Sequence, residues 1–325
     1  MRLVVREYAA KSPQAKGAPF CSLALILWVH KSAISGYDRP ADPPPAILAH
    51  VMSPTMMIGT PKTARLAAGT HSLHRLLSHS SRQELLRLAF DLGIRHFDTA
   101  PSYGAGLAER ELGRFARGRR DSLILASKFG IAPDRWTTVL PGGVYLAVLA
   151  GKLLRASRLR RSAAPAVNRD YSVAALERSV EASLRRLRTD YLDILFLHAP
   201  LAESLIDGER LVRSLEALRG AGKVRRFGLS GNGEHCGAIA QRYPALAEIL
   251  QIDVPADPDG LPSPQPLPSW ATIGLWDAPA SAAHLPAATL QSACQRLIRA
   301  MPAGLILVSA HQAPVLRMAA KLLAG

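Results

Sequence analysis

Residues 94–130 contain two apolar runs that each end at an ionisable residue, and this stretch most constrains the fold. The run IRHF stops at Asp98, and the later run LILAS stops at Lys128. A turn-rich PSYGAG segment, which contains Tyr103, and a helical pattern of apolar residues lie between them. Strand, loop, helix, loop and strand in this order predict a βαβ unit. Because the carboxyl ends of parallel strands open into a cleft, the ionisable residues are expected at a functional site.

A third apolar run, in DYLDILFLHAP, ends at His198. The FDTAxxYG wording, the strand that ends in lysine and this strand-end histidine together resemble the aldo-keto reductase family. The phrases LRGAGKVRRFGLSG and LILVSAHQAPVLR look like the fifth and eighth strand regions of that family. In the family, Asp, Tyr, Lys and His form a catalytic tetrad. The resemblance, which covers residues 56–325, therefore implies that Asp98, Tyr103, Lys128 and His198 are catalytic.

The fold class implied by the resemblance is α/β, a (β/α)8 TIM barrel that begins with a β-hairpin in TMMIGTPKTARLAAGT. A chain of 325 residues can hold such a barrel, which typically needs about 250 residues, together with an extension. A long insertion, residues 131–171, follows the third strand and is favoured as a lid, with a membrane-surface segment as the alternative. The stretch VPADPDGLPSPQPLPSW is too rich in proline for a helix, so the sixth outer helix is expected to be missing from a reduced C-terminal third.

The remaining elements follow from apolar periodicity. Ser81 is predicted to cap the first helix, with Glu84 completing a capping box. Further helices are predicted near residues 173–187 and 207–219. Strands are expected near residues 65–70, 94–98, 123–128, 192–198, 225–230 and 248–253, and then in ATIGLW and GLILVS.

Residues 1–55 show little periodic pattern and are predicted to be a disordered or over-extended leader to the barrel of residues 56–325. Their single apolar run, FCSLALILWV, is half the roughly 20 residues needed to span a bilayer. The charged and polar residues directly after this run argue against a secretory signal. No membrane partner is expected.

The formal net charge of +15 comes from 32 arginines against 8 lysines. We interpret this charge mainly as solvated helix faces, with attraction for anions as the alternative. Aromatic residues do not alternate with the basic runs, so a nucleic-acid partner is not expected. The three cysteines are far apart and form neither a disulfide framework nor a metal site, which favours a cytoplasmic protein without a metal.

The residue types of the tetrad suit carbonyl reduction. No side chain donates hydride, so a nicotinamide cofactor is required. Tyr103 can supply the proton once a nearby ammonium, Lys128, lowers its pKa from about 10. Asp98 would hold that lysine, and His198 would orient the carbonyl of an aldehyde, ketone or sugar substrate.

The resemblance also implies the cofactor contacts. Ser230 and Gln251 match positions that hold the nicotinamide carboxamide, although Gly231 stands where the family usually has asparagine, with Asn232 one place later. Trp276 matches an aromatic residue that stacks on the nicotinamide ring.

At the phosphate end, Ser309, His311, Gln312 and Arg317 are the expected contacts, but the family's Lys-Ser pair is replaced by Ser-Ala. The resemblance implies NADP(H) as the cofactor, since it is the default in the family. The changed phosphate loop leaves NAD(H) as the alternative. A barrel that binds the cofactor as a regulatory or sensor protein, with little turnover, remains the second functional hypothesis.

Overall fold

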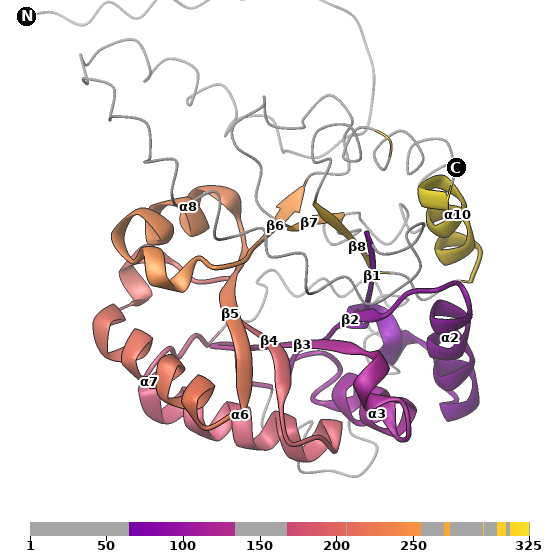
Figure 1. Cartoon of the computed structure of the whole chain (residues 1–325), viewed down its shortest axis with the longest axis horizontal. Helices are drawn as coiled ribbons and strands as arrows, with labels where there is room; N and C mark the ends of the chain where they lie inside the picture. The colour runs from indigo at the N-terminus through magenta and orange to yellow at the C-terminus, as the bar shows by residue number, and fades with distance from the viewer. Residues whose placement is uncertain are drawn as a thin grey trace, which may run out of the picture. The chain divides into compact units, whose positions relative to one another are not determined.

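The computed structural model describes residues 65–133, 168–205, 207–254, 270–273, 295, 304–309 and 313–324. Within these residues eight parallel strands form a closed barrel in which each strand neighbours the next in sequence (Figure 1). Pairing between β8 and β1 closes the ring. The predicted (β/α)8 barrel is therefore confirmed. The expected N-terminal hairpin, most of the insertion and the position of the missing sixth helix lie outside the described residues.

The strands agree with the sequence-based expectation to within two residues at each end, except β7, whose described part ends three residues before the predicted end. They are β1 (Leu66–Gly69), β2 (His96–Asp98), β3 (Ile124–Phe129), β4 (Leu192–His198), β5 (Val224–Gly231), β6 (Leu250–Val254), β7 (Trp270–Ile273) and β8 (Leu305–Ser309).

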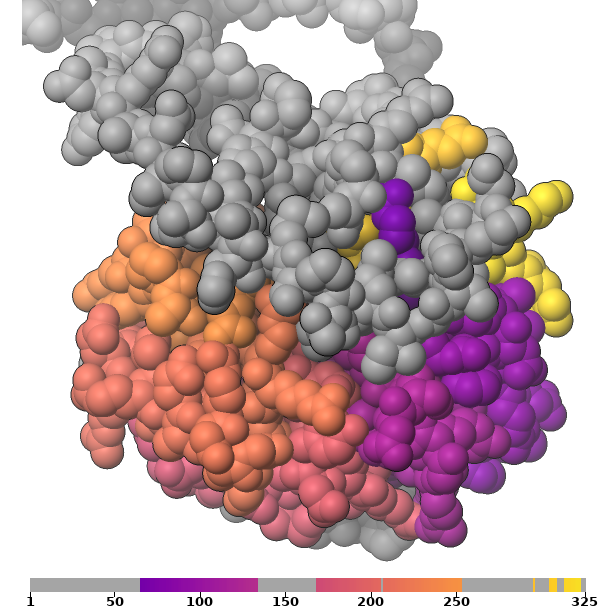
Figure 2. All heavy atoms as spheres, viewed as in Figure 1, coloured from indigo at the N-terminus to yellow at the C-terminus, as the bar shows by residue number. Residues whose placement is uncertain are grey.

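Outer helices follow most of the strands, as expected for this fold. They are α2 (His79–Asp91), α3 (Leu107–Ala116), α6 (Val173–Leu187), α7 (Gly208–Gly220), α8 (Gly233–Arg242) and α10 (Ala313–Ala324). Figure 1 shows α2, α3, α6, α7 and α8 on the outside of the strands, and Figure 2 shows the atoms of the same part of the chain coloured in chain order from indigo to orange. In the described parts of the chain, no helix is both long and apolar enough to cross a membrane.

The first of these helices begins three residues earlier than predicted. Ser78, not Ser81, is the N-cap of α2, and its hydroxyl oxygen accepts a hydrogen bond from the Ser81 backbone N–H at 3.0 Å. Ser78 has the extended backbone conformation that an N-cap requires. The sequence SHSS contains three serines, and the capping-box pattern led to the prediction of Ser81 instead of Ser78.

The interior of the barrel is apolar, as the alternation of inward and outward side chains along each strand requires. One buried cluster consists of alternate strand residues and of Ile249, directly before β6, while a larger cluster packs the outward strand faces under the helices. The inner cluster comprises Ala67, Ile124, Ala126, Ile194, Phe196, Ile249, Leu305 and Leu307. The interior of the barrel is thus filled with side chains. This packed core lies directly below the carboxyl ends of the strands.

Two outer helices, α3 and α6, approach so closely that only glycine fits at their contact. A Cβ atom on Gly113 would lie 2.5 Å from the Arg186 backbone oxygen and 2.6 Å from the Leu187 backbone. The absence of a side chain at Gly113 lets the end of α6 rest directly on α3. This contact fixes α3, which follows the loop that carries Tyr103.

Candidate active site

The predicted lysine and histidine lie directly beyond the apolar barrel core. Lys128 is two residues after Ala126 on β3, and His198 is two residues after Phe196 on β4. Since side chains alternate along a strand, both continue the inward-facing rows of their strands. Asp98 ends β2 in the same way. Three strand-end residues are therefore directed to the carboxyl-end mouth of the barrel.

Two predicted cofactor residues join this layer through strand register. His198 is paired with Ser230 between β4 and β5, and Ser230 is paired with Gln251 between β5 and β6. Ser230 is 5% exposed and Gln251 is 1% exposed. The three side chains lie on consecutive strands at one height of the barrel.

Lys128 and Asp98 form a buried ion pair at the centre of the site. Their side chains are 2% and 1% exposed, and the lysine Nζ donates a hydrogen bond to Asp98 Oδ1. The Thr99 carbonyl oxygen lies 3.4 Å from the same Nζ. Burial raises the pKa of the Asp98 carboxyl, while the adjacent ammonium opposes that rise. A paired lysine is the form in which this side chain is tolerated inside a protein.

Tyr103 completes the group from the loop between β2 and α3. Its side chain is 4% exposed, and the centre of its ring lies 5.3 Å from Lys128 Nζ. The His198 ring meets the Tyr103 ring edge-on, with 5.8 Å between ring centroids. The structure therefore brings all four predicted catalytic residues together around one tyrosine ring.

A second histidine, which the sequence did not indicate, also contacts Tyr103. His71 lies in a short 3₁₀ turn, η2 (His71–Arg75), after β1. Its ring meets the Tyr103 ring edge-on, with 4.9 Å between centroids. Burial, and then the charges of His74, Arg75 and Lys128, lower the pKa of His71 to about 3. The imidazole beside the tyrosine is therefore neutral at physiological pH.

The backbone around His198 is held by the last residues of the insertion. The Tyr171 hydroxyl donates to the His198 carbonyl oxygen at 2.6 Å, and Arg169 Nε donates to the Ala199 carbonyl oxygen at 3.1 Å. Ala199 has a φ of 48°, a left-handed conformation that non-glycine residues adopt only when their surroundings enforce it. Arg169 and Tyr171 thus fix the end of β4. The sequence did not reveal this role because the contacts span almost thirty residues.

The pKa of His198 is lowered well below the ordinary value for histidine. Burial is the main cause, followed by the charges of Lys128, His71 and Arg169. Its buried Nδ1 has no hydrogen-bond partner among the described residues. The ring is therefore a neutral imidazole whose hydrogen-bonding capacity is not fully used by the described part of the protein.

The residues at the carboxamide end fit a nicotinamide group. Gln251 Nε2 donates to Asp98 Oδ1 at 3.3 Å, while the buried Gln251 Oε1 has no partner in the described structure. A carboxamide carries N–H groups that can donate hydrogen bonds to such an oxygen. The side-chain oxygen of Asn232 caps α8 by accepting from the Glu234 and His235 backbone N–H groups, so this oxygen is engaged away from Ser230.

The predicted phosphate contacts are only partly visible. Ser309 is the last residue of β8, and Arg317 is an exposed residue of α10. Trp276, His311 and Gln312 lie outside the described residues. In the described ranges, no group of three or more His, Cys, Asp or Glu side chains is placed to hold a metal ion.

Comparison with known proteins agrees with this geometry. A family model described as the aldo/keto reductase family matches residues 65–239. The chain belongs to the aldo/keto reductase family. The match begins just before β1 and ends in α8, so it includes all four residues of the predicted tetrad.

Curated relatives of the family match shorter parts of the chain. D-threo-aldose 1-dehydrogenase from a Pseudomonas species is 30% identical over 177 residues, which are 50% of this chain and 47% of that protein. The 6-dehydroglucose reductase of Agrobacterium fabrum is 35% identical over 141 residues, 42% of this chain and 39% of that protein. The chain thus spans about half the length of the curated relatives it matches.

Solved structures of the family share the fold over most of the chain. The glycerol dehydrogenase of Gluconobacter oxydans superimposes with a TM-score of 0.56 at 19% identity, covering 79% of this chain and 86% of that one. An aldo/keto reductase from Klebsiella pneumoniae, solved with NADP and acetate, gives a TM-score of 0.51 at 22% identity, covering 80% and 85%. At this level of identity the likeness supports the barrel fold.

Proposed function

We propose that this chain is an NAD(P)H-dependent oxidoreductase that transfers a hydride between nicotinamide and an aldehyde, ketone or sugar hemiacetal. The observation that carries the proposal is the buried Lys128–Asp98 ion pair directly beside the ring of Tyr103. Stability of the barrel does not explain a paired lysine beside a tyrosine at the barrel mouth, because burying the charged pair costs free energy. Tyr103 and Lys128 are instead suited to transferring a proton.

Tyr103 is the proton donor for the carbonyl oxygen during reduction and the acceptor in the reverse direction. An isolated tyrosine has a pKa near 10, which makes proton transfer at neutral pH unfavourable. The Lys128 ammonium lies 5.3 Å from the centre of the ring and favours the phenolate form. Asp98 holds the ammonium in place. The bound reduced nicotinamide supplies the hydride.

His198 orients the substrate. Its lowered pKa keeps the imidazole neutral, so a ring N–H can donate a hydrogen bond to the carbonyl oxygen without competing with Tyr103 as the acid. The hydrogen bonds from Arg169 and Tyr171 to the adjacent backbone fix the position of this donor. A donor held in place before the reaction lowers the cost of reorganisation as charge develops on the oxygen.

Ser230 and Gln251 would hold the carboxamide, with the Gln251 amide oxygen accepting from its N–H group. We propose NADP(H) as the preferred cofactor and NAD(H) as the alternative. A relative of the same fold was solved with NADP, and Arg317 is available for an additional phosphate. Trp276, Ser309, His311 and Gln312 remain predicted contacts.

For the substrate we propose a small polyhydroxylated carbonyl compound or sugar. The supporting relatives are named as a D-threo-aldose dehydrogenase, a 6-dehydroglucose reductase and a glycerol dehydrogenase. His71 adds a polar, neutral side chain next to Tyr103, which suits a substrate that carries hydroxyl groups. We also propose a cytoplasmic location, because the three cysteines are far apart in the sequence and do not indicate disulfides.

The test is turnover by the wild-type chain and by Tyr103→Phe. NADPH or NADH absorbance is followed with a panel of aldoses, ketoses and simple aldehydes. The substitution removes only the hydroxyl, so cofactor binding measured by fluorescence should persist while kcat falls about 10²- to 10⁴-fold. A variant that retains more than about a tenth of kcat would contradict the role of Tyr103. Cofactor binding without turnover of any substrate by the wild type would favour the sensor hypothesis instead.

A further inference from the structure

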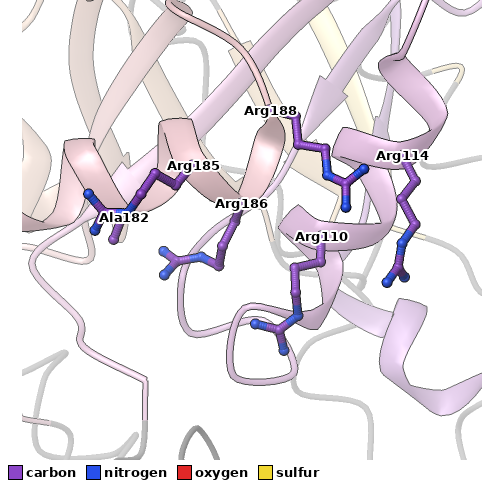
Figure 3. A pocket seen from close by; sticks show the side chains of 6 residues that line it. All are labelled: Arg110, Arg114, Ala182, Arg185, Arg186 and Arg188. Atoms are coloured by element: carbon purple, nitrogen blue, oxygen red, sulfur yellow. The ribbon is translucent and has the colours of Figure 1, made fainter.

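Five arginine side chains from two neighbouring outer helices line one pocket of about 240 Å³ on the outside of the barrel (Figure 3). None of the residues proposed for catalysis or cofactor binding lines it. The pocket is lined by Arg110 and Arg114 of α3, by Arg185 and Arg186 at the end of α6, by Arg188 at the C-cap of α6, and by Ala182. We call these five residues the arginine pocket.

Two members of the arginine pocket have carboxylate partners. Arg186 Nε lies 2.5 Å from Glu109 Oε2, and Arg114 Nη1 lies 2.9 Å from Glu111 Oε1. Both glutamates are almost completely buried on α3, and Arg186 and Arg114 contribute to their neutralisation, for Glu111 together with the buried Arg82.

The other three members have no such partner. Among the described residues, no ion pair joins Arg110, Arg185 or Arg188 to a carboxylate. One long hydrogen bond, from Arg110 Nη2 to the Ala105 carbonyl oxygen at 3.4 Å, is formed within the protein. The pocket therefore holds three more guanidinium charges than carboxylates. Structural neutralisation of Glu109 and Glu111 does not account for this excess.

The guanidinium groups are close enough to influence each other. Burial lowers the pKa of Arg110, the charges of Arg186 and Arg114 lower it further, and the charges of Glu109 and Glu111 oppose this lowering. The neighbouring guanidinium groups repel one another, which costs free energy. They stay close together because α3 and α6 are packed tightly at Gly113. A bound anion would remove the repulsion. Arginine is also the side chain whose planar donor fork matches a phosphate group.

We propose that the arginine pocket binds a compact anion that carries two or more phosphate groups. An excess of three positive charges matches the charge of a diphosphate better than that of a single carboxylate. The pocket is confined to two helices and its lining contains no aromatic side chain on which a nucleic-acid base could stack. A small phosphorylated molecule fits these features better than a nucleic-acid strand.

The test is calorimetric titration of the full chain with inorganic pyrophosphate at constant ionic strength, with single-stranded DNA as a second ligand. Arg110→Gln combined with Arg185→Gln removes two unpaired charges and leaves both buried ion pairs intact. The matched control is Arg178→Gln, on the same helix, whose side chain is 70% exposed and lies 3.9 Å from the exposed Asp170. The double variant should bind pyrophosphate at least about tenfold more weakly, and the control should bind it like the wild type.

Three results would overturn the proposal. They are no pyrophosphate binding by the wild type, equal binding by the double variant, and tighter binding of DNA than of pyrophosphate. Pyrophosphate binding that survives in the double variant would belong to another site, such as the predicted phosphate contact on α10. Without ligand the double variant should melt at the wild-type temperature or above, because like-charge repulsion is relieved. If it does not fold, the single Arg188→Gln substitution, at an exposed helix end, gives the same test.

Discussion

The Gln251 side-chain amide donates a hydrogen bond to Asp98 Oδ1 at 3.3 Å, on the same carboxylate oxygen that accepts from Lys128. This contact joins the residue expected to hold the nicotinamide carboxamide to the ion pair beside Tyr103. It also fixes which end of the Gln251 amide remains available, since the nitrogen is engaged and the buried oxygen has no described partner. Cofactor binding and the position of the lysine are therefore linked through one carboxylate.

Replacing Gln251 with leucine tests this link. Leucine has a similar size but neither donates to Asp98 nor accepts from a carboxamide. We expect NADPH binding to weaken about three- to tenfold, the worth of a single neutral hydrogen bond. Titration of the cofactor's fluorescence measures the change. Unchanged affinity would show that Gln251 serves only to hold Asp98, in which case kcat at saturating cofactor would be the quantity that falls.

A pair of glycine substitutions tests the contact between α3 and α6. Gly113→Ala would place a Cβ 2.5 Å from the Arg186 backbone oxygen, so the helices must separate. We expect a loss of about 1–3 kcal/mol in the free energy of unfolding, the usual cost of overpacking. Urea denaturation followed by circular dichroism gives the value.

Gly237→Ala on α8 is the matched control, because nothing lies within 4 Å of a Cβ at that position. There the substitution only restricts the unfolded chain and should stabilise the protein by about 0.4–1 kcal/mol. Opposite signs for the two variants are the expected result. A Gly113→Ala variant as stable as the control would mean that α3 and α6 do not pack as closely as described.

Much of this architecture follows from local sequence pattern. The bounds of β4 were predicted to the residue, and the apolar face predicted for α6 runs from the first to the last residue of the observed helix. Asp98 and His198 end β2 and β4 as the same patterns predicted, while Lys128 lies one residue before the end of β3. These features depend on neighbouring residues and are therefore visible in a single sequence.

What the sequence did not reveal depends on contacts between distant segments. The charged residues were expected to lie mainly on solvated helix faces, but Glu109 and Glu111 are buried on α3. Glu109 accepts from Ser127 Oγ at 2.7 Å and pairs with Arg186, and Glu111 is contacted by Arg114. Several arginines thus neutralise buried acids. Periodicity cannot predict this arrangement, because it depends on how α3 packs against its neighbours.

The lowered pKa of His71 predicts a specific dependence of stability on pH. In the unfolded chain this histidine titrates near 6.5, whereas in the folded protein its pKa is about 3. Between these values the unfolded state binds one more proton, so stability is lost as the pH falls. In His71→Asn this proton is absent. From pH 6 to pH 4 the variant should lose about 2 kcal/mol less free energy of unfolding than the wild type.

Urea unfolding at the two pH values measures this difference. The pKa values of His96 and His198 are also lowered by burial, so both proteins should lose stability in acid. Comparison of the two proteins isolates the contribution of His71. Parallel losses in the two proteins would show that His71 takes up a proton in the folded state, and would remove the neutral imidazole from beside Tyr103.

The choice between NADP and NAD depends on one additional phosphate, and Arg317 is the described residue best suited to bind it. Arg317 lies on α10, one turn after the helix begins, and its side chain is exposed. If it binds the phosphate, Arg317→Ala should weaken NADPH binding by about 1.5–3 kcal/mol, the worth of a hydrogen bond to a charged group. NADH binding should hardly change, because NADH lacks that phosphate. Lys321→Ala, one turn further along α10, is the matched control. Equal affinities of the wild type for both cofactors, unaffected by the change at Arg317, would make this an enzyme without NADP preference.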